Sequence, residues 1–194
     1  MSEARSILNG ATFEGAIKIT ETGLHGMITL RGDLSGRALQ KAVKSATGAD
    51  LPQARKITFG KAGNVAWMSP DELLLMVNYA TADAVVKSLG EALKDVHHMA
   101  VNVSDARAIF RLTGKGAREV LAKGAPVDLS SAAFNVGDLR RTRIGQLASA
   151  FWMLEDGTIE VLCFRSVGES MFDWLCNASE KDSFPGFFEV KQSG

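Results

Sequence analysis

Familiar catalytic motifs are missing from this 194-residue sequence, so any chemistry would have to come from scattered polar residues. No GxGxxG segment follows a predicted strand, and neither a Walker phosphate loop nor an HExxH pair occurs. The segment RLTGKGARE, residues 111–119, places Gly-Lys-Gly where a strand gives way to a helix, and backbone N–H groups there could bind an anion. Because it lacks the glycine spacing and the Lys-Ser/Thr pair of a phosphate-binding loop, we interpret it as a tight turn.

Histidine and cysteine, the usual protein ligands of zinc, do not occur at a zinc-binding spacing. The histidines are His25, His97 and His98, and the cysteines are Cys163 and Cys176. We therefore expect no metal site, and we place His97 and His98 near the negative end of a helix dipole. The cysteines form no CxxC pair, and the reducing cytosol would keep both as free thiols. We expect both to be buried.

Two acidic pairs, Asp71-Glu72 and Glu155-Asp156, fall in predicted turns. We expect both pairs to be solvated, with no cause for a shifted pKa. The tryptophans are more consistent with anchors of a core or an interface than with a cofactor site; they are Trp67, Trp152 and Trp174.

The densest basic cluster is DLRRTRIG, residues 138–145, which contains Arg140, Arg141 and Arg143. Alternation along a strand places Arg141 and Arg143 on one face. There they could hold a carboxylate or pair with the acidic side chains of a partner. The alternative is a strand face that is simply solvated.

Composition limits the classes of partner. The chain has 22 Lys+Arg and 22 Asp+Glu residues, so it lacks the positive field that nucleic acids or anionic membranes require. Its longest aliphatic run, residues 73–77, is far shorter than the ~20 residues of a membrane span, and MSEARSILNG has no apolar signal core. We expect a cytoplasmic protein. The hydrophobic fraction of 46% together with 19 glycines suggests some surface covered by a partner.

Periodicity predicts a series of elements in the first half of the chain. A strand ends at Gly32, and an amphipathic helix follows and ends at Gly48. Further strands are predicted at 57–59, 64–68 and 73–77, the last two joined by the turn Ser-Pro-Asp-Glu. A second helix begins with Thr81 as its N-cap, and a further strand is possible after it.

The same series begins again after residue 105. A strand ends at Gly114, a short helix ends at Gly124, and strands follow at 138–144, 148–154 and 158–164. A last helix is opened by a capping box of Ser166 and Glu169. The hairpins 66–77, AWMSPDELLLMV, and 150–164, AFWMLEDGTIEVLCF, match each other if Trp67 is aligned with Trp152.

This order of elements is close to that of a ferredoxin-like unit, so we predict an α+β fold with two tandem or intertwined ferredoxin-like units and antiparallel sheets. The expected boundaries are an N-terminal arm of weak structure at 1–22, a first repeat at 23–100 and a second repeat at 101–194. Together the repeats would make one compact domain.

Several segments resemble the gamma subunit of heterotetrameric sarcosine oxidase. They are ITLRGD, WMSPDELLL, VNVSDARAIFRLTGKGAREVLAKGAPVDL, RTRIGQ and FRSVGESMFDWL, in order from about residue 20 to residue 175. The Trp-x-x-Pro-Asp-Glu element is the most specific of them. The sequence departs from the family in having Ser69 where Gly is usual and Leu73 where Trp is common, which affects the hairpin turn and so the partner surface.

The resemblance implies the folate-binding fold of the glycine-cleavage T-protein and a role as a non-catalytic subunit. The complex it resembles demethylates sarcosine oxidatively to glycine, passes the one-carbon unit to tetrahydrofolate and forms hydrogen peroxide. Its partners would be the alpha, beta and delta subunits, with FAD, FMN, NAD, tetrahydrofolate and zinc held on those other subunits. No catalytic, cofactor-binding or metal-binding residue is then expected in this chain.

A free-standing folate-binding or aminomethyltransferase-like protein is the alternative. Relatives of the T-protein that act in iron–sulfur assembly carry a Lys-Gly-Cys-Tyr-x-Gly-Gln element. Its nearest match here, RIGQ at residues 143–146, has no cysteine. A gamma-like subunit for another N-methyl amino acid remains a third hypothesis.

Overall fold

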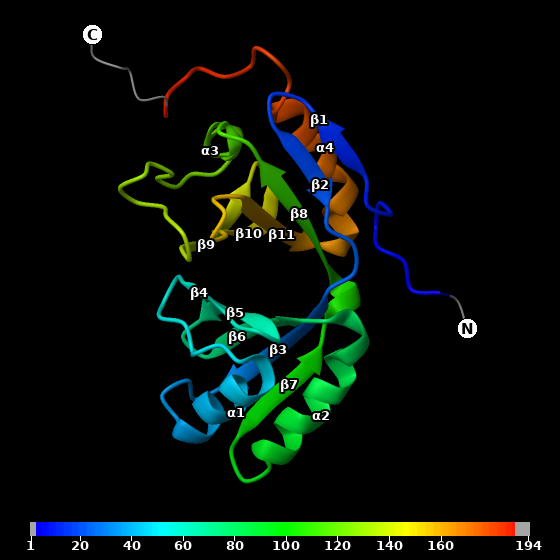
Figure 1. Ribbon diagram of the computed structural model, residues 1–194, viewed down its shortest axis with the longest axis vertical. Helices are drawn as coiled ribbons and strands as arrows, with labels where there is room; N and C mark the ends of the chain where they lie inside the picture. The colour runs from blue at the N-terminus through cyan, green and yellow to red at the C-terminus, as the bar shows by residue number, and fades with distance from the viewer. Residues whose placement is uncertain (1–2, 189–194) are drawn as a thin grey trace. The chain divides into compact units, whose positions relative to one another are not determined.

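The computed structural model describes residues 3–188, which divide into two compact units (Figure 1). The continuous unit comprises residues 24–106 together with 137–139. Within the described residues, the composite unit comprises 3–23, 107–136 and 140–188. None of the helices in residues 3–188 combines the length and the apolar character needed to cross a bilayer.

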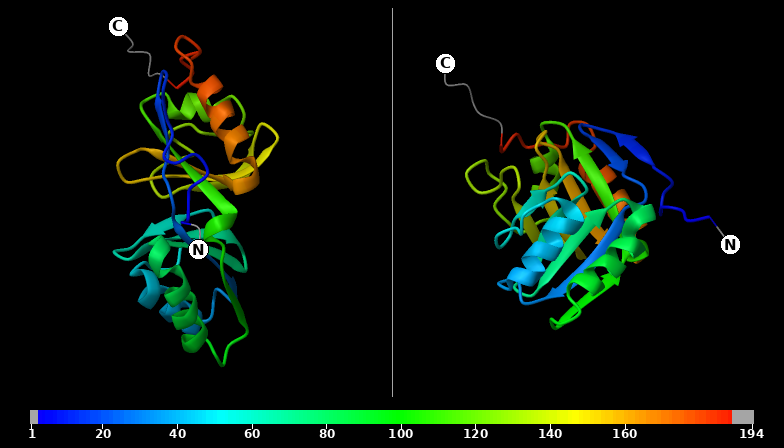
Figure 2. Two further views of the ribbon diagram at one scale, coloured as in Figure 1. Left: turned by 90° about the vertical axis from the view of Figure 1, so that its right-hand side faces the viewer. Right: turned by 60° about the horizontal axis from the view of Figure 1, so that its bottom comes forward.

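The continuous unit is a five-stranded antiparallel sheet with two helices on one face (Figure 2). Its sheet has the order β4-β5-β6-β3-β7. In sequence its elements are β3 (Gly26–Gly32), α1 (Arg37–Thr47), β4 (Ile57–Phe59), β5 (Gly63–Ser69), β6 (Glu72–Val77), α2 (Ala82–Ala92) and β7 (His98–Asn102).

Alternation along the central strands produces the core of this unit. Leu30 pairs with Leu73 and Ile28 pairs with Leu75, so these side chains share one sheet face. All are fully buried, and they pack with the apolar stripes of the helices. The stripes include Leu39 and Val43 of α1 and Leu89 of α2.

Two of the three predicted helix ends are confirmed in position, and the third is wrong. Gly48 ends α1 in the left-handed conformation, at φ 77°, as predicted. Thr81 is the N-cap residue of α2 as predicted, but its side chain makes no capping bond. A 3-10 turn, η1 (Tyr79–Thr81), precedes α2, and the Asn78 side chain caps that turn. A second 3-10 turn, η3 (Arg165–Val167), precedes the last helix, so Ser166 does not form the predicted capping box.

The composite unit is a six-stranded antiparallel sheet of order β1-β2-β8-β11-β10-β9. Helix α4 lies against β2, β8 and β11, and α3 contacts α4. In sequence its elements are β1 (Thr12–Glu14), β2 (Lys18–Glu21), β8 (Arg107–Thr113), α3 (Ala117–Ala122), β9 (Leu139–Ile144), β10 (Leu147–Met153), β11 (Ile159–Phe164) and α4 (Gly168–Ala178).

The two sheets share one topology, although different parts of the chain complete them. The order β9-β10-β11-β8-β2 repeats the order β4-β5-β6-β3-β7, with β2 in the place of β7. In the continuous unit the position next to β3 is filled by β7, which follows α2. In the composite unit the equivalent position next to β8 is filled by β2, which comes from near the N-terminus. An internal duplication would explain the shared order, and it stays a prediction.

The expectation that residues 1–22 carry little structure of their own is wrong. Strand β2 pairs along its whole length with β8, and Ile19, fully buried, faces Leu112 in the register. The buried Glu21 accepts hydrogen bonds from the Ser6 hydroxyl and the Gly10 N–H, at 2.9 and 2.7 Å between the bonded atoms. The segment therefore belongs to the composite unit. The continuous unit begins at Leu24, one residue after the expected start, and its main segment ends at Ala106 instead of residue 100.

The two Trp-Met hairpins correspond in the structure, but one residue out of the predicted alignment. Leu73 and Ile159 occupy the same place in their sheets, since each pairs with the leucine of a Leu-x-Gly strand end. Trp67 pairs with Leu73, whereas Ile159 pairs with Met153. Trp67 thus corresponds to Met153. Trp152 points to the sheet face opposite that of Met153, because neighbouring side chains of a strand alternate between the two faces.

Replacing Ile19 tests whether the N-terminal strand is part of the core. We expect Ile19→Ala to lower the free energy of unfolding by about 2–4 kcal/mol, because it leaves a cavity among buried side chains. The matched control is Lys18→Ala, since the Lys18 side chain is 52% exposed. Urea denaturation followed by circular dichroism measures both, and equal midpoints would show that β2 contributes nothing to the core.

Candidate functional site

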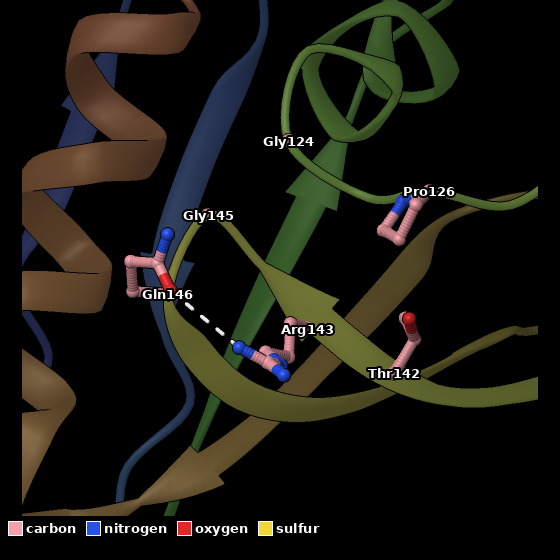
Figure 3. Close-up of a pocket in the computed structure, with 6 residues that line it drawn as sticks. All are labelled: Gly124, Pro126, Thr142, Arg143, Gly145 and Gln146. Atoms are coloured by element: carbon pink, nitrogen blue, oxygen red, sulfur yellow. Dashed lines mark hydrogen bonds between the residues drawn. The ribbon is translucent and has the colours of Figure 1, made fainter.

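An open hollow of about 450 Å³ lies in the composite unit beside the turn that joins β9 to β10 (Figure 3). The turn is Gly145-Gln146, and Gly145 has φ 57°, as the first residue of a two-residue hairpin turn commonly requires. The lining residues come from this hairpin and from the segment after α3; they are Gly124, Pro126, Thr142, Arg143, Gly145 and Gln146.

Gly124 and Gly145, at one wall of the hollow, allow Trp174 of α4 to pack closely against them. The N–H of Gly145 donates to the carbonyl of Gly124 at 3.0 Å, which joins the hairpin turn to the segment after α3. A Cβ on Gly124 would lie 2.4 Å from the Trp174 ring, so only glycine fits there. Trp174, half-buried in α4, therefore supports this close approach.

The arginines of β9 divide as alternation predicts. Arg141 and Arg143 are exposed, whereas Arg140 and Thr142 are half-buried. The prediction that Arg141 and Arg143 share a face is confirmed. Arg143 borders the hollow, and its Nη1 lies 3.5 Å from Oε1 of Gln146, a long and weak hydrogen bond (Figure 3). Within residues 3–188 no carboxylate forms an ion pair with Arg143.

Arg140 has a structural role in the loop before β9. It donates to the carbonyl of Ala133, and its guanidinium lies 5.5 Å from the centre of the Phe134 ring. Arg118 of α3 lies 5.7 Å from the same ring and donates to the carbonyl of Leu129. Burial lowers the pKa of Arg118 from its ordinary value. These contacts hold the loop between α3 and β9 in place.

A buried carboxylate that the sequence analysis did not single out lies in β11. Glu160 is 6% exposed, and its two oxygens have different partners. Arg111 donates to Oε1 at 2.7 Å, and the indole N–H of the fully buried Trp152 donates to Oε2 at 3.0 Å. A charged residue within the apolar run IEVLCF was the signal that could have identified it. With both oxygens bonded, Glu160 acts as a structural ion-pair partner.

The remaining predicted candidates lie apart from the hollow. Lys115 is exposed in the turn before α3, a helix of six residues, and a Cβ on Gly116 would collide with Phe184, so packing accounts for this glycine. Helix α2 ends at Ala92, so the histidine pair is not at its end. His98 lies in β7, with Nδ1 2.8 Å from the carbonyl of Val96. Within residues 3–188, His, Cys, Asp and Glu side chains form no group of three that could hold a metal ion.

The acidic pairs require a correction. Asp71, Glu155 and Asp156 are exposed as expected, whereas Glu72 is half-buried. The pKa of the Asp71 carboxyl and that of the Asp156 carboxyl are both lowered. For Asp71 the first cause is a hydrogen bond from the Ser69 hydroxyl, and for Asp156 it is one from the Thr158 hydroxyl. Both carboxyl groups stay ionised at neutral pH, so neither is suited to act as a general acid.

Both cysteines are free, Cys163 buried and Cys176 half-buried. Burial raises the pKa of the Cys163 thiol to about 12. Burial, with the nearby Asp173 carboxylate as the second cause, raises the pKa of Cys176 to about 11. Neither thiol is a thiolate at neutral pH, which makes both weak nucleophiles.

The role of Glu160 can be tested by Glu160→Gln. We expect the free energy of unfolding to fall by about 1–3 kcal/mol, because the buried Trp152 N–H and Arg111 lose a charged acceptor. Urea unfolding monitored by tryptophan fluorescence measures the change. Glu155→Gln, at an exposed turn position, is the control and should leave the midpoint unaltered. A similar midpoint for both variants would contradict a structural role for Glu160.

Thiol reactivity follows from the raised pKa values. At pH 8 we expect the native protein to react with Ellman's reagent far more slowly than the urea-unfolded chain, with Cys176 reacting before the buried Cys163. Cys163→Ser and Cys176→Ser assign the two phases. Rapid reaction of Cys163 in the native protein would show that it is accessible and activated.

Comparison with known proteins gives a consistent result. The family model described as "Sarcosine oxidase, gamma subunit family" matches residues 31–181. The sarcosine oxidase subunit gamma of Corynebacterium sp. (strain P-1) is 27% identical over 90% of this chain and 85% of the relative. That of Arthrobacter sp is 27% identical over 94% of this chain and 89% of the relative.

Two solved structures extend the comparison. The heterotetrameric sarcosine oxidase from Corynebacterium sp. U-96, in complex with pyrrole 2-carboxylate, contains a chain that is 26% identical, with a TM-score of 0.76 over 87% of both chains. The glycine cleavage system aminomethyltransferase T from Bartonella henselae is 13% identical, with a TM-score of 0.59 over 81% of this chain and 45% of that one, and it shows the fold alone. These likenesses confirm the predicted α+β, T-protein-like fold. Since the family model covers most of the sequence, the chain belongs to the sarcosine oxidase gamma subunit family.

Proposed function

We propose that this chain is the non-catalytic gamma subunit of a heterotetrameric sarcosine oxidase. Its partners are the alpha, beta and delta subunits, and the oxidative demethylation of sarcosine takes place on them. The observation that carries this proposal is the agreement over 87% of both chains, at a TM-score of 0.76, with a chain of an assembled heterotetrameric enzyme. On this proposal the flavins, NAD, tetrahydrofolate and zinc belong to the other subunits, in the cytoplasm.

The environments of the reactive side chains support this division of labour. The buried carboxylate of Glu160 is bonded on both oxygens, and the pKa of each thiol is raised away from the reactive thiolate form. On this proposal the Glu160 carboxylate and the two thiols serve the structure of the subunit and not a reaction. A subunit that contributes shape and surface needs no more than this.

Co-expression tests the proposal directly. We expect this chain to co-purify with alpha, beta and delta chains from the same organism and the complex to oxidise sarcosine with release of hydrogen peroxide. The chain purified alone should show neither flavin absorbance nor sarcosine turnover. A complex that assembles and works equally well without this chain would refute the proposal.

The isolated chain also distinguishes the alternative of a free-standing folate-binding or aminomethyltransferase-like protein. Calorimetry with tetrahydrofolate gives no heat of binding if the chain acts only as a subunit. Micromolar binding would favour the alternative. N-methyl amino acids other than sarcosine, offered to the same assembled complex, identify its substrate.

A further inference from the structure

We propose that the Arg143 end of β9, with the adjoining hollow, is the surface on which an acidic segment of a larger subunit docks. This inference rests on the proposed function, because it assigns a surface for the assembly described there. The occupant is a protein segment that places a carboxylate against the Arg143 guanidinium. The proposal follows from local charge, from the shape of the hollow and from the rigidity of its walls.

The segment that forms β9 and β10 carries an excess of positive charge, although the chain as a whole is neutral. Lys+Arg and Asp+Glu residues both number 22, yet no acidic residue occurs between Leu139 and Leu154. Within the same stretch Arg141 and Arg143 are exposed on one face of β9, the last strand in the order of its sheet. A local excess of positive charge attracts a partner of opposite charge and guides its approach.

The hollow supplies a place for the carboxylate beside this charge. Arg143, Gln146 and Thr142 provide the donor groups of its lining, and none of the lining residues is acidic. Among residues 3–188, the long contact to Gln146 is the one hydrogen bond of the Arg143 guanidinium, so its stronger donor directions can make a two-point bond to a carboxylate. Arginine is also among the residue types that contribute most to protein interfaces.

The walls of the hollow are held in place before any partner arrives. Gly124 and Gly145 are joined by a backbone hydrogen bond of 3.0 Å and lie close to Trp174. The loop between α3 and β9 is anchored by the fully buried Phe134, which lies beside Arg118 and Arg140 and edge-on to Phe151, at 5.5 Å between the ring centres. A surface that needs little ordering on contact binds its partner with less entropic cost.

Two exposed arginines favour an acidic protein segment over nucleic acid. Binding to a phosphate backbone uses many neutralised phosphates and a broad basic surface, whereas this chain has zero formal net charge. A single carboxylate matches the donors of the Arg143 guanidinium. Binding to duplex DNA that depended on Arg143 would therefore contradict the proposal.

A competition experiment in the assembled complex tests this surface. Wild-type and Arg143→Glu chains with different tags are expressed together with alpha, beta and delta chains. Mass spectrometry then compares the variant-to-wild-type ratio in the purified complex with the ratio in the total lysate. We expect incorporation of Arg143→Glu to fall by roughly tenfold or more, because a repulsive pair replaces an attractive one. Arg143→Gln should give a smaller loss.

The matched control is Arg37→Glu, an exposed arginine at the start of α1 that carries the same change of charge. It should be incorporated as well as the wild-type chain, and circular dichroism with Tm measurements should show that every variant folds. Equal incorporation of Arg143→Glu and Arg37→Glu would refute this docking surface while the proposed function stands. Failure of the wild-type chain to enter any complex would refute both.

Discussion

The pairing of β2 with β8 is the constraint on which the composite unit depends. It joins residues 18–21 to residues 110–113, so the N-terminal strands β1 and β2 form one end of a sheet built otherwise from the second half of the chain. Without β2, one side of β8 would lose its hydrogen-bonding partner, and the apolar face shared with α4 would lose Ile19. The cores of both units then follow from simple alternation along their central strands.

A complete sheet next to α4 also determines where the hollow forms. Helix α4 packs against β2, β8 and β11, and Trp174 extends from it to the glycines that join the β9–β10 turn to the segment after α3. The position of Arg143 therefore depends on elements that are distant in sequence. A charged surface held in this way is a property of the folded unit as a whole, which is what recognition by another protein requires.

Prediction from sequence succeeded where the period was clear and failed where tertiary contacts decide. Alternation identified β3 and β8, and it placed Arg141 and Arg143 on one face. A short, bounded apolar run identified β6. The four residues of β2, KITE, are too short to show a period, and only the pairing with β8 makes them a strand. Likewise, Glu160 is tolerated in an apolar strand because Arg111 and Trp152 reach it from the neighbouring strands. Local sequence contains neither partner.

The split of the composite unit has a consequence for the order of events during synthesis. On the ribosome, the strands and helices of the continuous unit are available once Asn102 has emerged, but the composite sheet needs β11, which ends at Phe164. The first strands to leave the exit tunnel, β1 and β2, must wait for β8, which ends at Thr113, before β2 can pair with it. Until then Ile19 is an exposed apolar side chain on a nascent polypeptide, where chaperones and proteases act.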